Sequence, residues 1–429
     1  MPATRPLPRL HRLAPKVFYG WFVAFGCGLL SFVVVGIGFY GLVVFLDALV
    51  AEHGWDRAQV AAATSLYWVV TGLVGIPIGR GVDRFGARGF LLAGVLVMAL
   101  ALVGIGRVTA PWQIFPLYVV LGIGFSLAGS IPSGAIITRW FSARRGMAMM
   151  LAHTGVSLGG IILVPLFSGW IATHGLAVAV DRLAAILLVV SLPMIGFVLR
   201  SDPRSHGLEA DGGQAISAEE TQTSRPRPGP RSQADILRSP AFRRLAASFG
   251  LMLFCQVAFA MHELAFFRGR IGPELAALAV SATAGGSLVG RLVVGSFADR
   301  MDRRPLAAAL FLLQAVMVAL AASAEGTTAL LVAAAGFGFT IGNIFLFQSL
   351  LVAELFGAAS FGTALGLLQL VSQIASGLGP LALGLLRSAH GAYEPALFWL
   401  VGGACGAAGI VLTIRQPGEE RGRETSVSG

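Results

Sequence analysis

The chain has 429 residues, of which 56% are hydrophobic and only 12% are charged. Soluble domains carry about 25% charged residues, so this composition excludes an ordinary soluble enzyme or binding domain and indicates many membrane-spanning segments. The formal net charge of +10 comes from arginines spread over many short polar stretches, which argues against nucleic acid as a partner.

Twelve segments are apolar enough and long enough to cross a bilayer, which takes about 20 residues in a helix. In chain order they lie at residues 18–46, 58–79, 89–107, 112–138, 146–171, 178–199, 242–266, 273–298, 305–323, 327–350, 361–386 and 392–414. The first segment follows a basic stretch and is too long for the core of a signal peptide. We therefore expect it to remain as a spanning helix.

The longest polar interruption separates the sixth segment from the seventh. It is rich in Pro, Gly, Ser and charged residues, which cannot bury a core, and so indicates a flexible linker. We expect an all-α integral membrane protein with two pseudo-symmetric six-helix bundles. The expected parts are a tail at 1–17, a bundle at 18–199, a linker at 200–241, a bundle at 242–415 and a tail at 416–429.

The distribution of Lys and Arg predicts the orientation in the membrane. With both termini inside, 24 of the 31 basic residues fall in inner segments, six in outer segments and one, Arg291, within a span. The positive-inside rule therefore predicts cytoplasmic termini. The strong preference for Arg over Lys is typical of a GC-rich bacterium, so we expect the protein in a bacterial cytoplasmic membrane.

An internal repeat relates the two halves. "GRGVDRFGAR" at 79–88 and "GSFADRMDRR" at 295–304 share the pattern G-x-x-x-D-R-x-x-x-R with an offset of 216 residues. Two further glycine pairs have the same offset: Gly122 with Gly338, and Gly146 with Gly362. A parallel repeat of six spans predicts two bundles that rock about a site near the middle of the membrane.

These residues resemble those of a known family. "GRGVDRFGAR" resembles the signature loop of the major facilitator superfamily, and "RWFSARRGMAMMLAHTGVSLGG" resembles its helix 4–5 loop. "YGWFV", "EHGWDRAQVAAATSLYWVVTGLVG", "GLEADG" and "GRLVVGSFADR" resemble the monocarboxylate and oxalate–formate branch. The resemblance covers nearly the whole chain. It implies a transporter that works by alternating access, with no enzyme activity and no cofactor.

The resemblance also implies a conformational latch in the repeated loops. The latch residues would be Gly79, Asp83, Arg84, Gly86 and Arg88, with Asp299 and Arg300 in the second copy. The residue types suit this role, because glycines allow close approach and turns, and a carboxylate can pair with a guanidinium or a helix N-terminus. The alternative interpretation is that these charges only follow the positive-inside rule.

Arg291 lies inside a predicted span, eight residues before Asp299 and therefore about 12 Å from the helix end. An Arg at this depth costs from about 2.5 to more than 10 kcal/mol. Thr283, Ala284 and Ser287 form a small, weakly polar face beside it, which suits a water-filled cavity. A guanidinium binds a carboxylate bidentately, so we interpret Arg291 as the anchor of an anionic substrate. A structural ion pair or a snorkelling side chain are the alternatives.

Other polar residues in the spans are weaker substrate candidates. His153 forms a polar and small stripe with Ser157 and Gly160, and its counterpart at the 216 offset is Gln369. Asn343 is the only asparagine in the chain. In the functional interpretation these residues bind substrate. In the alternative interpretation His153 has a structural role, and the other polar side chains only hold neighbouring helices together.

Tyrosines within the spans complete the candidate set. The hydroxyl groups of Tyr118 and Tyr40 are candidates for a hydrogen bond to a carboxylate or hydroxyl of a bound substrate. Tyr67 and Trp68 are instead interpreted as residues of the aromatic belt at the membrane interface. The G-x-x-x-G pairs at Gly75/Gly79, Gly155/Gly159, Gly286/Gly290 and Gly338/Gly342 are expected to mark close helix contacts within one chain. The hydrolase-like "GVSLG" therefore predicts packing rather than catalysis.

The chain departs from the resembled branch at its charged positions. Animal members carry a Lys in helix one and an Asp one turn before the helix-eight Arg, whereas the only Lys here is Lys16 and the equivalent of the Asp is Ser287. A single cation favours a monocarboxylate over a dicarboxylate. Proton symport then remains open through His153 or through Glu263.

The sequence predicts a secondary active transporter that moves a small organic anion, with protons as a candidate coupling ion. The alternative is a drug or other small-solute efflux transporter of the same superfamily. A transporter-like sensor or membrane enzyme is disfavoured, because no signalling domain and no catalytic constellation is evident. We expect a monomer in the lipid bilayer, with no metal, no cofactor and no nucleic acid.

Overall fold

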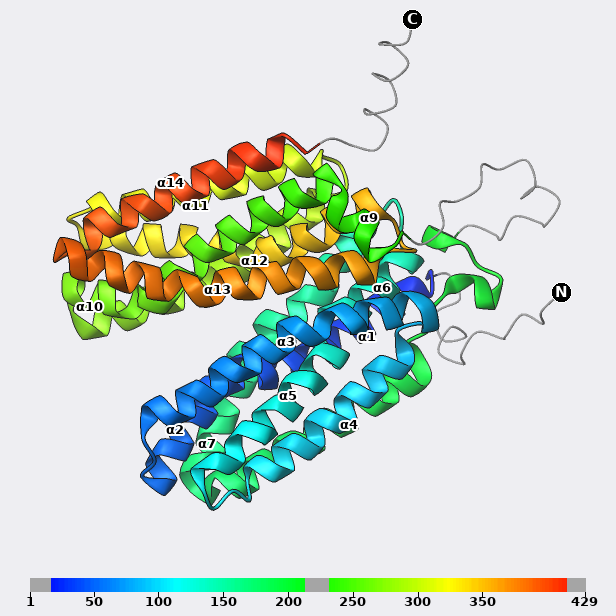
Figure 1. The fold of residues 1–429 in the computed structure, drawn as a ribbon, viewed down its shortest axis with the longest axis horizontal. Helices are drawn as coiled ribbons and strands as arrows, with labels where there is room; N and C mark the ends of the chain where they lie inside the picture. The colour runs from blue at the N-terminus through cyan, green and yellow to red at the C-terminus, as the bar shows by residue number, and fades with distance from the viewer. Residues whose placement is uncertain (1–16, 213–230, 415–429) are drawn as a thin grey trace, which may run out of the picture. The chain divides into compact units, whose positions relative to one another are not determined.

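Residues 17–212 and 231–414 are described by a computed structural model, and this part of the chain is organised in α-helices (Figure 1). The predicted C-terminal tail at 416–429, and the predicted N-terminal tail except Val17, lie outside the described residues. So do residues 213–230 of the predicted linker. The chain divides into two compact units, Met1–Pro230 with Ala358–Gly366, and Arg231–Gly357 with Leu367–Gly429.

The first unit holds seven α-helices and two π-helical turns among its described residues. They are α1 (Gly20–Val35), η2 (Gly36–Tyr40), α2 (Gly41–His53), α3 (Arg57–Phe85), α4 (Arg88–Ile105), α5 (Ile114–Ala128), α6 (Ser130–Trp140), α7 (Arg145–Pro193) and η4 (Met194–Val198). Short 3-10 turns follow at Pro111–Gln113, Pro203–His206 and Ala210–Gly212. Because α1, η2 and α2 are continuous, they form one crossing.

The second unit is built from longer, less interrupted helices. They are α9 (Gln233–Arg238), α10 (Pro240–Phe297), α11 (Arg303–Ser323), α12 (Thr327–Phe356), α13 (Phe361–His390) and α14 (Tyr393–Leu412). The first turn of α13, up to Gly366, groups with the first unit.

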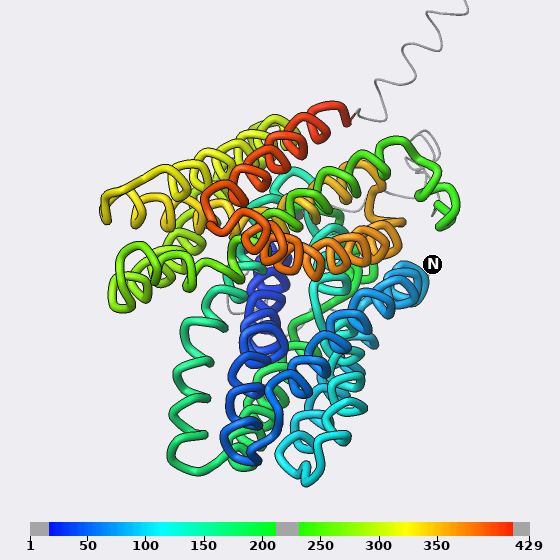
Figure 2. The backbone as a smooth tube through the Cα atoms, turned by 60° about the vertical axis from the view of Figure 1, so that its left-hand side comes forward, coloured from blue at the N-terminus to red at the C-terminus, as the bar shows by residue number. Residues whose placement is uncertain are grey.

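The described residues provide twelve crossings, as the sequence predicted. Within the described ranges, ten helical stretches are long and apolar enough to span a membrane. Two of them, at Arg145–Val198 and Pro240–Phe297, contain 54 and 58 residues. As straight helices they would be about 81 and 87 Å long, more than twice the hydrocarbon thickness. Each is broken at one glycine, Gly175 (φ +79°) or Gly272 (φ +81°), and Figure 2 shows the chain reversing direction within each of the two stretches. Each therefore makes two crossings.

The predicted connections at these two reversals were wrong in detail. The sequence placed six-residue loops at 172–177 and at 267–272, but both are helical except for the single glycine. The apolar residues on either side continue the helix, and one residue with positive φ, which glycine adopts without steric cost, is enough to turn the chain. Gly391, which lies 216 residues after Gly175, also has positive φ (+71°). The repeat is therefore visible in the backbone.

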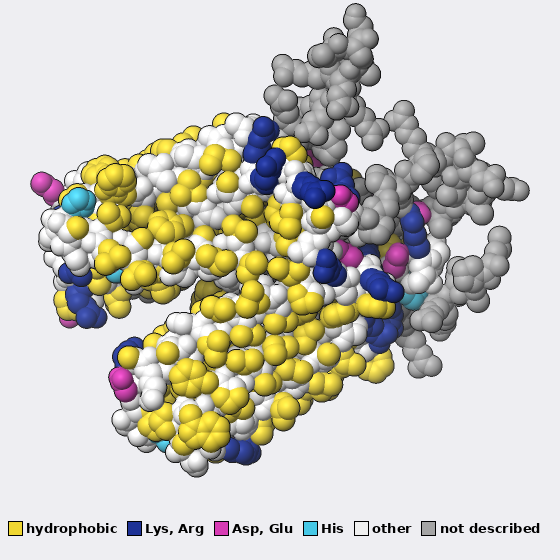
Figure 3. Space-filling view, viewed as in Figure 1, with side chains coloured by type: hydrophobic (Ala, Val, Ile, Leu, Met, Phe, Trp, Pro, Cys, Tyr) yellow, Lys and Arg dark blue, Asp and Glu magenta, His cyan; other side chains and the backbone are white. Residues whose placement is uncertain are grey.

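The surface of each unit agrees with a lipid environment. Large hydrophobic side chains are exposed along the helices, among them Phe25, Val69, Leu100, Val189 and Trp399. Figure 3 shows hydrophobic side chains along the sides of the helices in both units, with charged groups gathered towards the helix ends. A helix that is apolar on all faces is typical of a membrane span.

Candidate functional site

Arg291 is buried in the second unit, with 4% of its surface exposed. It lies on α10, and its Nε donates a hydrogen bond of 3.0 Å to the carbonyl oxygen of Gly342 on α12. A snorkelling side chain would instead extend to the end of its helix. The guanidinium is therefore held in the contact between α10 and α12.

Glycines make that contact possible. A Cβ atom at Gly286 or Gly290 would collide with the backbone of α12, and a Cβ atom at Gly338 or Gly342 would collide with the backbone of α10. The prediction that G-x-x-x-G pairs mark close contacts within the chain is confirmed here. It is also confirmed for Gly155 and Gly159, where a Cβ atom would meet the backbone of α1.

Asn343 follows Gly342 directly and is fully buried. Its Nδ2 donates to the carbonyl oxygen of Phe339 at 2.8 Å, while its Oδ1 is buried and accepts no hydrogen bond from the described residues. Such an acceptor costs free energy unless a partner reaches it. Arg291 thus binds the backbone of the residue directly before Asn343, whose Oδ1 has no partner among the described residues.

The predicted polar face beside Arg291 is only partly exposed. Thr283 is buried at 8% exposure, Ser287 is half-buried and Ala284 is exposed. The hydroxyl of Thr283 lies 3.0 Å from the carbonyl oxygen of Ala334 on α12. The face therefore turns partly towards α12.

The polar stripe of the first unit lies on α7. His153 is half-buried, and its Nδ1 lies 2.8 Å from the carbonyl oxygen of Met149, so Nδ1 carries the proton and donates. Two turns later, Gly160 packs against the ring of Tyr40, which a Cβ atom at Gly160 would approach to 3.0 Å. Tyr40 thus joins this stripe. Gln369, the counterpart of His153, is half-buried on α13 of the second unit.

Tyr118 and Tyr67 form a separate buried group. Both side chains have 0% exposure, and the hydroxyl of Tyr67 donates to the carbonyl oxygen of Gly38 at 2.5 Å. The prediction that Tyr67 belongs to the interfacial belt was wrong, because hydropathy does not reveal that α3 turns this side chain inwards. Gly38 lies in the π-helical turn η2, a type of irregularity that is frequent at functional sites.

Asp83 caps the first turn of α13 within the first unit. Its carboxylate accepts hydrogen bonds from the backbone N–H groups of Gly362 and Thr363, both at 2.8 Å, and from the hydroxyl of Thr363 at 2.7 Å. Gly79 permits this approach, since a Cβ atom there would overlap the carbonyl of Gly362. Gly86 ends α3 with φ +85°. Of the two partners that the sequence left open, the helix N-terminus is the one observed.

The other predicted latch residues have different neighbours. Arg88 donates to the carbonyl oxygens of Ile195 and Gly196 at 2.8 and 2.7 Å. The guanidinium of Arg84 lies over the ring of Phe85, 5.1 Å from its centroid. Asp83, Arg84 and Arg88 therefore do not form one cluster.

The second copy of the latch loop is built differently. Asp299 forms an ion pair with Arg303 at 3.5 Å, and Arg303 also reaches Glu354 at 3.3 Å, while the side chain of Arg300 is exposed. Hydrogen bonds from Arg304 lower the pKa of the neighbouring Asp302 carboxyl. The second copy therefore repeats the loop sequence, but Asp299 does not repeat the capping contact that Asp83 makes.

Sequence reasoning missed two polar residues that fix loops. Thr363 gives Asp83 two of its three hydrogen bonds, and nothing at the repeat offset signals it. Asp211 accepts hydrogen bonds from the backbone N–H groups of Ser142, Ala143 and Arg144, at 2.9, 2.7 and 3.3 Å. Its signal was the "GLEADG" stretch, in which an acidic residue stands directly before a glycine.

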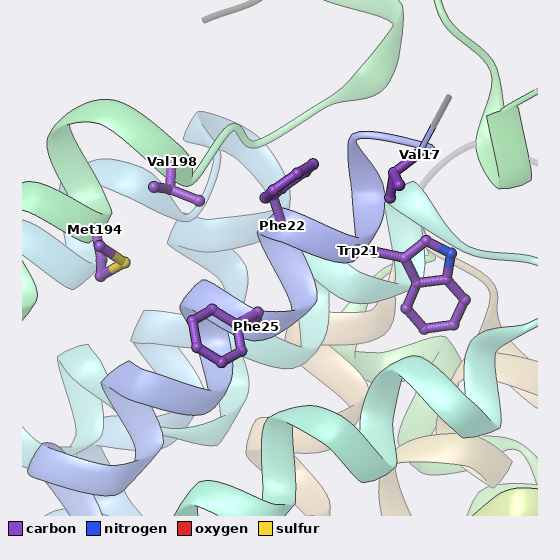
Figure 4. A pocket seen from close by; sticks show the side chains of 6 residues that line it. All are labelled: Val17, Trp21, Phe22, Phe25, Met194 and Val198. Atoms are coloured by element: carbon purple, nitrogen blue, oxygen red, sulfur yellow. The ribbon is translucent and has the colours of Figure 1, made fainter. Parts of the chain in front are cut away.

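A pocket of about 450 Å³ opens at the start of α1. Figure 4 shows the side chains that line it: Val17, Trp21, Phe22, Phe25, Met194 and Val198. All six are hydrophobic, and no predicted substrate residue is among them. We do not assign this pocket to an anionic substrate, because it offers no charged group.

Comparisons with known proteins give a consistent result. Residues 28–271 and 257–429 match the family model of the Major Facilitator Superfamily. The chain is 28% identical over 413 residues to monocarboxylate transporter 13 of Bos taurus, covering 93% of this chain and 90% of that protein.

Solved structures share the fold at low sequence identity. The fucose:proton symporter of E. coli has a TM-score of 0.72 at 16% identity, covering 92% of this chain and 98% of that one. The human organic anion transporter MFSD10 has a TM-score of 0.67 at 16% identity, covering 91% and 98%.

Proposed function

Since the chain belongs to the Major Facilitator Superfamily and is a multi-pass membrane transporter rather than an enzyme, we propose that it carries a small organic anion as a secondary active transporter. The proposed substrate class is monocarboxylates, and the proposed mechanism is alternating access. The proposal depends on one observation, the buried guanidinium of Arg291 within a membrane span.

A buried arginine at this depth favours a bound anion. Leaving a guanidinium in a span costs at least about 2.5 kcal/mol, and an anionic substrate would offset that cost during transport. The bond from Nε to Gly342 fixes the plane of the guanidinium, and planar donors recognise a carboxylate bidentately. Arg291 is thus suited to a carboxylate.

Asn343 would extend recognition beyond the carboxylate. Its Oδ1 is buried beside Gly342 and accepts nothing from the described residues, so it can accept a hydrogen bond from a substrate hydroxyl. A 2-hydroxy acid such as lactate presents both groups on adjacent carbons. The name of the bovine relative, a monocarboxylate transporter at 28% identity, supports the same substrate class.

The remaining predictions form part of the proposal. His153, Tyr118, Tyr40 and Gln369 are proposed as further substrate contacts. Asp83 and Gly79, with the loop residues around them, are proposed as a latch of one conformational state. We also propose that the two six-helix bundles at 18–199 and 242–415 are joined by a cytoplasmic linker at 200–241. The protein would lie as a monomer in a bacterial cytoplasmic membrane with both termini inside.

Uptake into proteoliposomes tests the anion site. Radiolabelled L-lactate is supplied to wild-type protein, to Arg291→Gln and to a matched control, Arg268→Gln, which removes an exposed arginine from the same helix. We expect Arg291→Gln to reduce uptake at least about 30-fold, since truncating one partner of a buried charge pair costs about 2 kcal/mol or more. Arg268→Gln should retain wild-type uptake.

Two results would count against the proposal. Undiminished uptake by Arg291→Gln would refute the proposal that Arg291 binds the anion, and would favour an efflux transporter for other solutes. No uptake by wild-type protein would exclude lactate, and the same three proteins would then be tested with pyruvate, acetate, formate and oxalate. Failure with every carboxylate would refute the proposed substrate class.

A further inference from the structure

Glu263 is a buried carboxyl group of the second unit to which the anion site gives no role. It lies on α10, nine residues before the chain reversal at Gly272, which corresponds to about 14 Å along the helix. Only 4% of its surface is exposed, and Phe259, Phe266 and Phe267 on the same helix are buried in the surrounding core. A carboxylate in such surroundings is costly unless it is paired or protonated.

The hydrogen bonds around Glu263 favour the protonated form. Its Oε1 is hydrogen-bonded to the hydroxyl of Thr283, and that hydroxyl oxygen also lies 3.0 Å from the carbonyl oxygen of Ala334. A hydroxyl has a single proton to donate. If Glu263 is neutral, it donates to Thr283, and the Thr283 proton stays available for the carbonyl oxygen of Ala334 at 3.0 Å or of Ala279 at 3.3 Å. If Glu263 is ionised, the Thr283 proton must turn to the carboxylate and away from Ala334.

No positive charge compensates Glu263 within the part of the chain that the structure describes: its carboxyl forms no ion pair there. The adjacent His262 faces elsewhere, with Nδ1 3.1 Å from the hydroxyl of Tyr393 and Nε2 3.1 Å from the carbonyl oxygen of Pro380. Arg270, close to the chain reversal, binds a different carboxylate, that of Glu394, at 2.8 Å.

Helices α10 to α14 carry twelve further titratable groups, and among the described residues none of them forms an ion pair or a hydrogen bond with Glu263. They are Arg243, Arg244, Cys255, Arg268, Glu274, Arg291, Arg303, Arg304, Glu354, Arg387, His390 and Cys405. Of these, Arg303 and Glu354 pair with each other at the opposite end of the helices. Proton binding is therefore the available way to neutralise Glu263.

Glu263 is connected to the same helix contact as Arg291. Thr283, Ser287 and Arg291 follow one another at intervals of four residues on α10 and therefore lie along one face. Thr283 is within hydrogen-bond distance of Ala334 on α12, and Arg291 donates to Gly342 on α12, two turns further along. The two ends of this face are about 12 Å apart along the helix.

We propose that Glu263 is the proton-binding residue that couples transport to a proton gradient, with Thr283 positioning its carboxyl group. The proposal rests on the proposed function as an anion transporter. One substrate carboxylate at Arg291 and one proton at Glu263 carry charges of −1 and +1, so the pair crosses without net charge. The proton binds the Glu263 carboxylate from water on one side and returns to water on the other.

Infrared titration of purified protein tests the proton site without any substrate. A protonated carboxyl group has a carbonyl stretch that disappears when the group ionises. We expect a band present at neutral pH in wild-type protein and in Glu274→Gln, which removes an exposed glutamate from the same helix. The band should be absent from Glu263→Gln. An unchanged band in Glu263→Gln would overturn the proposal, and equal gel-filtration profiles would establish that the variants are folded.

Transport with and without a pH gradient tests the coupling. With L-lactate, the rate at which Glu263→Gln exchanges internal for external substrate should lie within about threefold of the wild-type rate, a change below 1 kcal/mol. Its accumulation under an inward acid gradient should fall to the level seen without a gradient, while Glu274→Gln should accumulate normally. Gradient-driven accumulation by Glu263→Gln would overturn the coupling role. If wild-type protein carries no carboxylate at all, the proposed function fails, and the infrared titration still decides whether Glu263 binds the proton.

Discussion

Asp83 accepts two hydrogen bonds from Thr363, one from its hydroxyl at 2.7 Å and one from its backbone N–H at 2.8 Å, across a separation of 280 residues. A third bond, from the backbone N–H of Gly362, completes a cap on the first turn of α13. The carboxylate thus satisfies donors that a helix N-terminus otherwise leaves without partners. It also places a negative charge at the positive end of the helix dipole.

Asp83→Asn should lower the stability of the protein by about 1–3 kcal/mol, because hydrogen bonds to a charged group are worth about 1.5–3 kcal/mol and an amide replaces only part of them. The matched control is Asp299→Asn, at the repeat-equivalent position. Its partner Arg303 keeps a second carboxylate, Glu354, at 3.3 Å, so the loss should be below about 1 kcal/mol. Denaturant unfolding in detergent measures both, and equal losses would contradict the capping role.

Arg291→Lys should bind substrate more weakly than wild type even though the charge is kept. A lysine cannot present the planar fork of a guanidinium and also loses the bond from Nε to the carbonyl of Gly342. We expect the KM for L-lactate to rise about 10- to 100-fold, equivalent to about 1.4–2.8 kcal/mol. The concentration dependence of uptake measures this. A KM equal to that of wild type would mean that only the charge at this position matters.

Asp211→Ala should destabilise the turn at residues 142–144 that leads into α7. Asp211 has φ +60° and accepts hydrogen bonds from three successive backbone N–H groups, so alanine loses the acceptor and is also strained in the left-handed region. Hydrogen exchange of the amides of Ser142, Ala143 and Arg144 should accelerate about tenfold for each 1.4 kcal/mol lost. Asparagine tolerates this conformation, so Asp211→Asn should show a smaller effect. No difference between the two variants would exclude the backbone contribution.

Asp302 should contribute stability that depends on pH. Hydrogen bonds with Arg304 lower the pKa of its carboxyl, so the contribution is present above the ordinary value of about 3.9 and is lost as the pH falls through the lowered value. Because the side chain is 42% exposed, the effect should be at most about 1 kcal/mol.

The variant Asp302→Asn isolates this contribution, since asparagine caps a helix as well as aspartate does but forms no ion pair. Wild type should unfold at a higher temperature than Asp302→Asn near about pH 7, and the difference should shrink and vanish as the pH falls through the lowered pKa of Asp302. Asp56→Asn is the control, because Asp56 caps α3 through Ala58 without an ion pair among the described residues. A difference that does not change with pH would refute the assignment.

The crossings and the repeat could be predicted from the sequence because both depend on local properties. Hydropathy over about 20 residues marks a span whatever its neighbours are, and the offset of 216 residues recurs in the backbone at Gly175 and Gly391. The glycine pairs were predictable for the same reason, since small residues spaced by four lie on one helix face.

The partners of individual side chains were not predictable in this way. Whether Tyr67 faces lipid or protein depends on how α3 is rotated, and the sequence fixes that rotation only through packing against distant segments. The partner of Asp83 was open for a related reason. Its contact with Thr363 requires α3 to approach α13 closely at Gly79, and such an approach becomes visible only in three dimensions.

The close packing of α10 and α12 has a consequence for the transport cycle. Four glycines place each backbone against the other, so neither helix can rotate or shift by one residue without a collision. We therefore expect α12 and the part of α10 after Gly272 to move together, with Arg291 and Asn343 keeping their spacing. In the proposed function this pair would be preorganised, and a difference in substrate affinity between the two sides of the membrane would then have to arise from groups outside it.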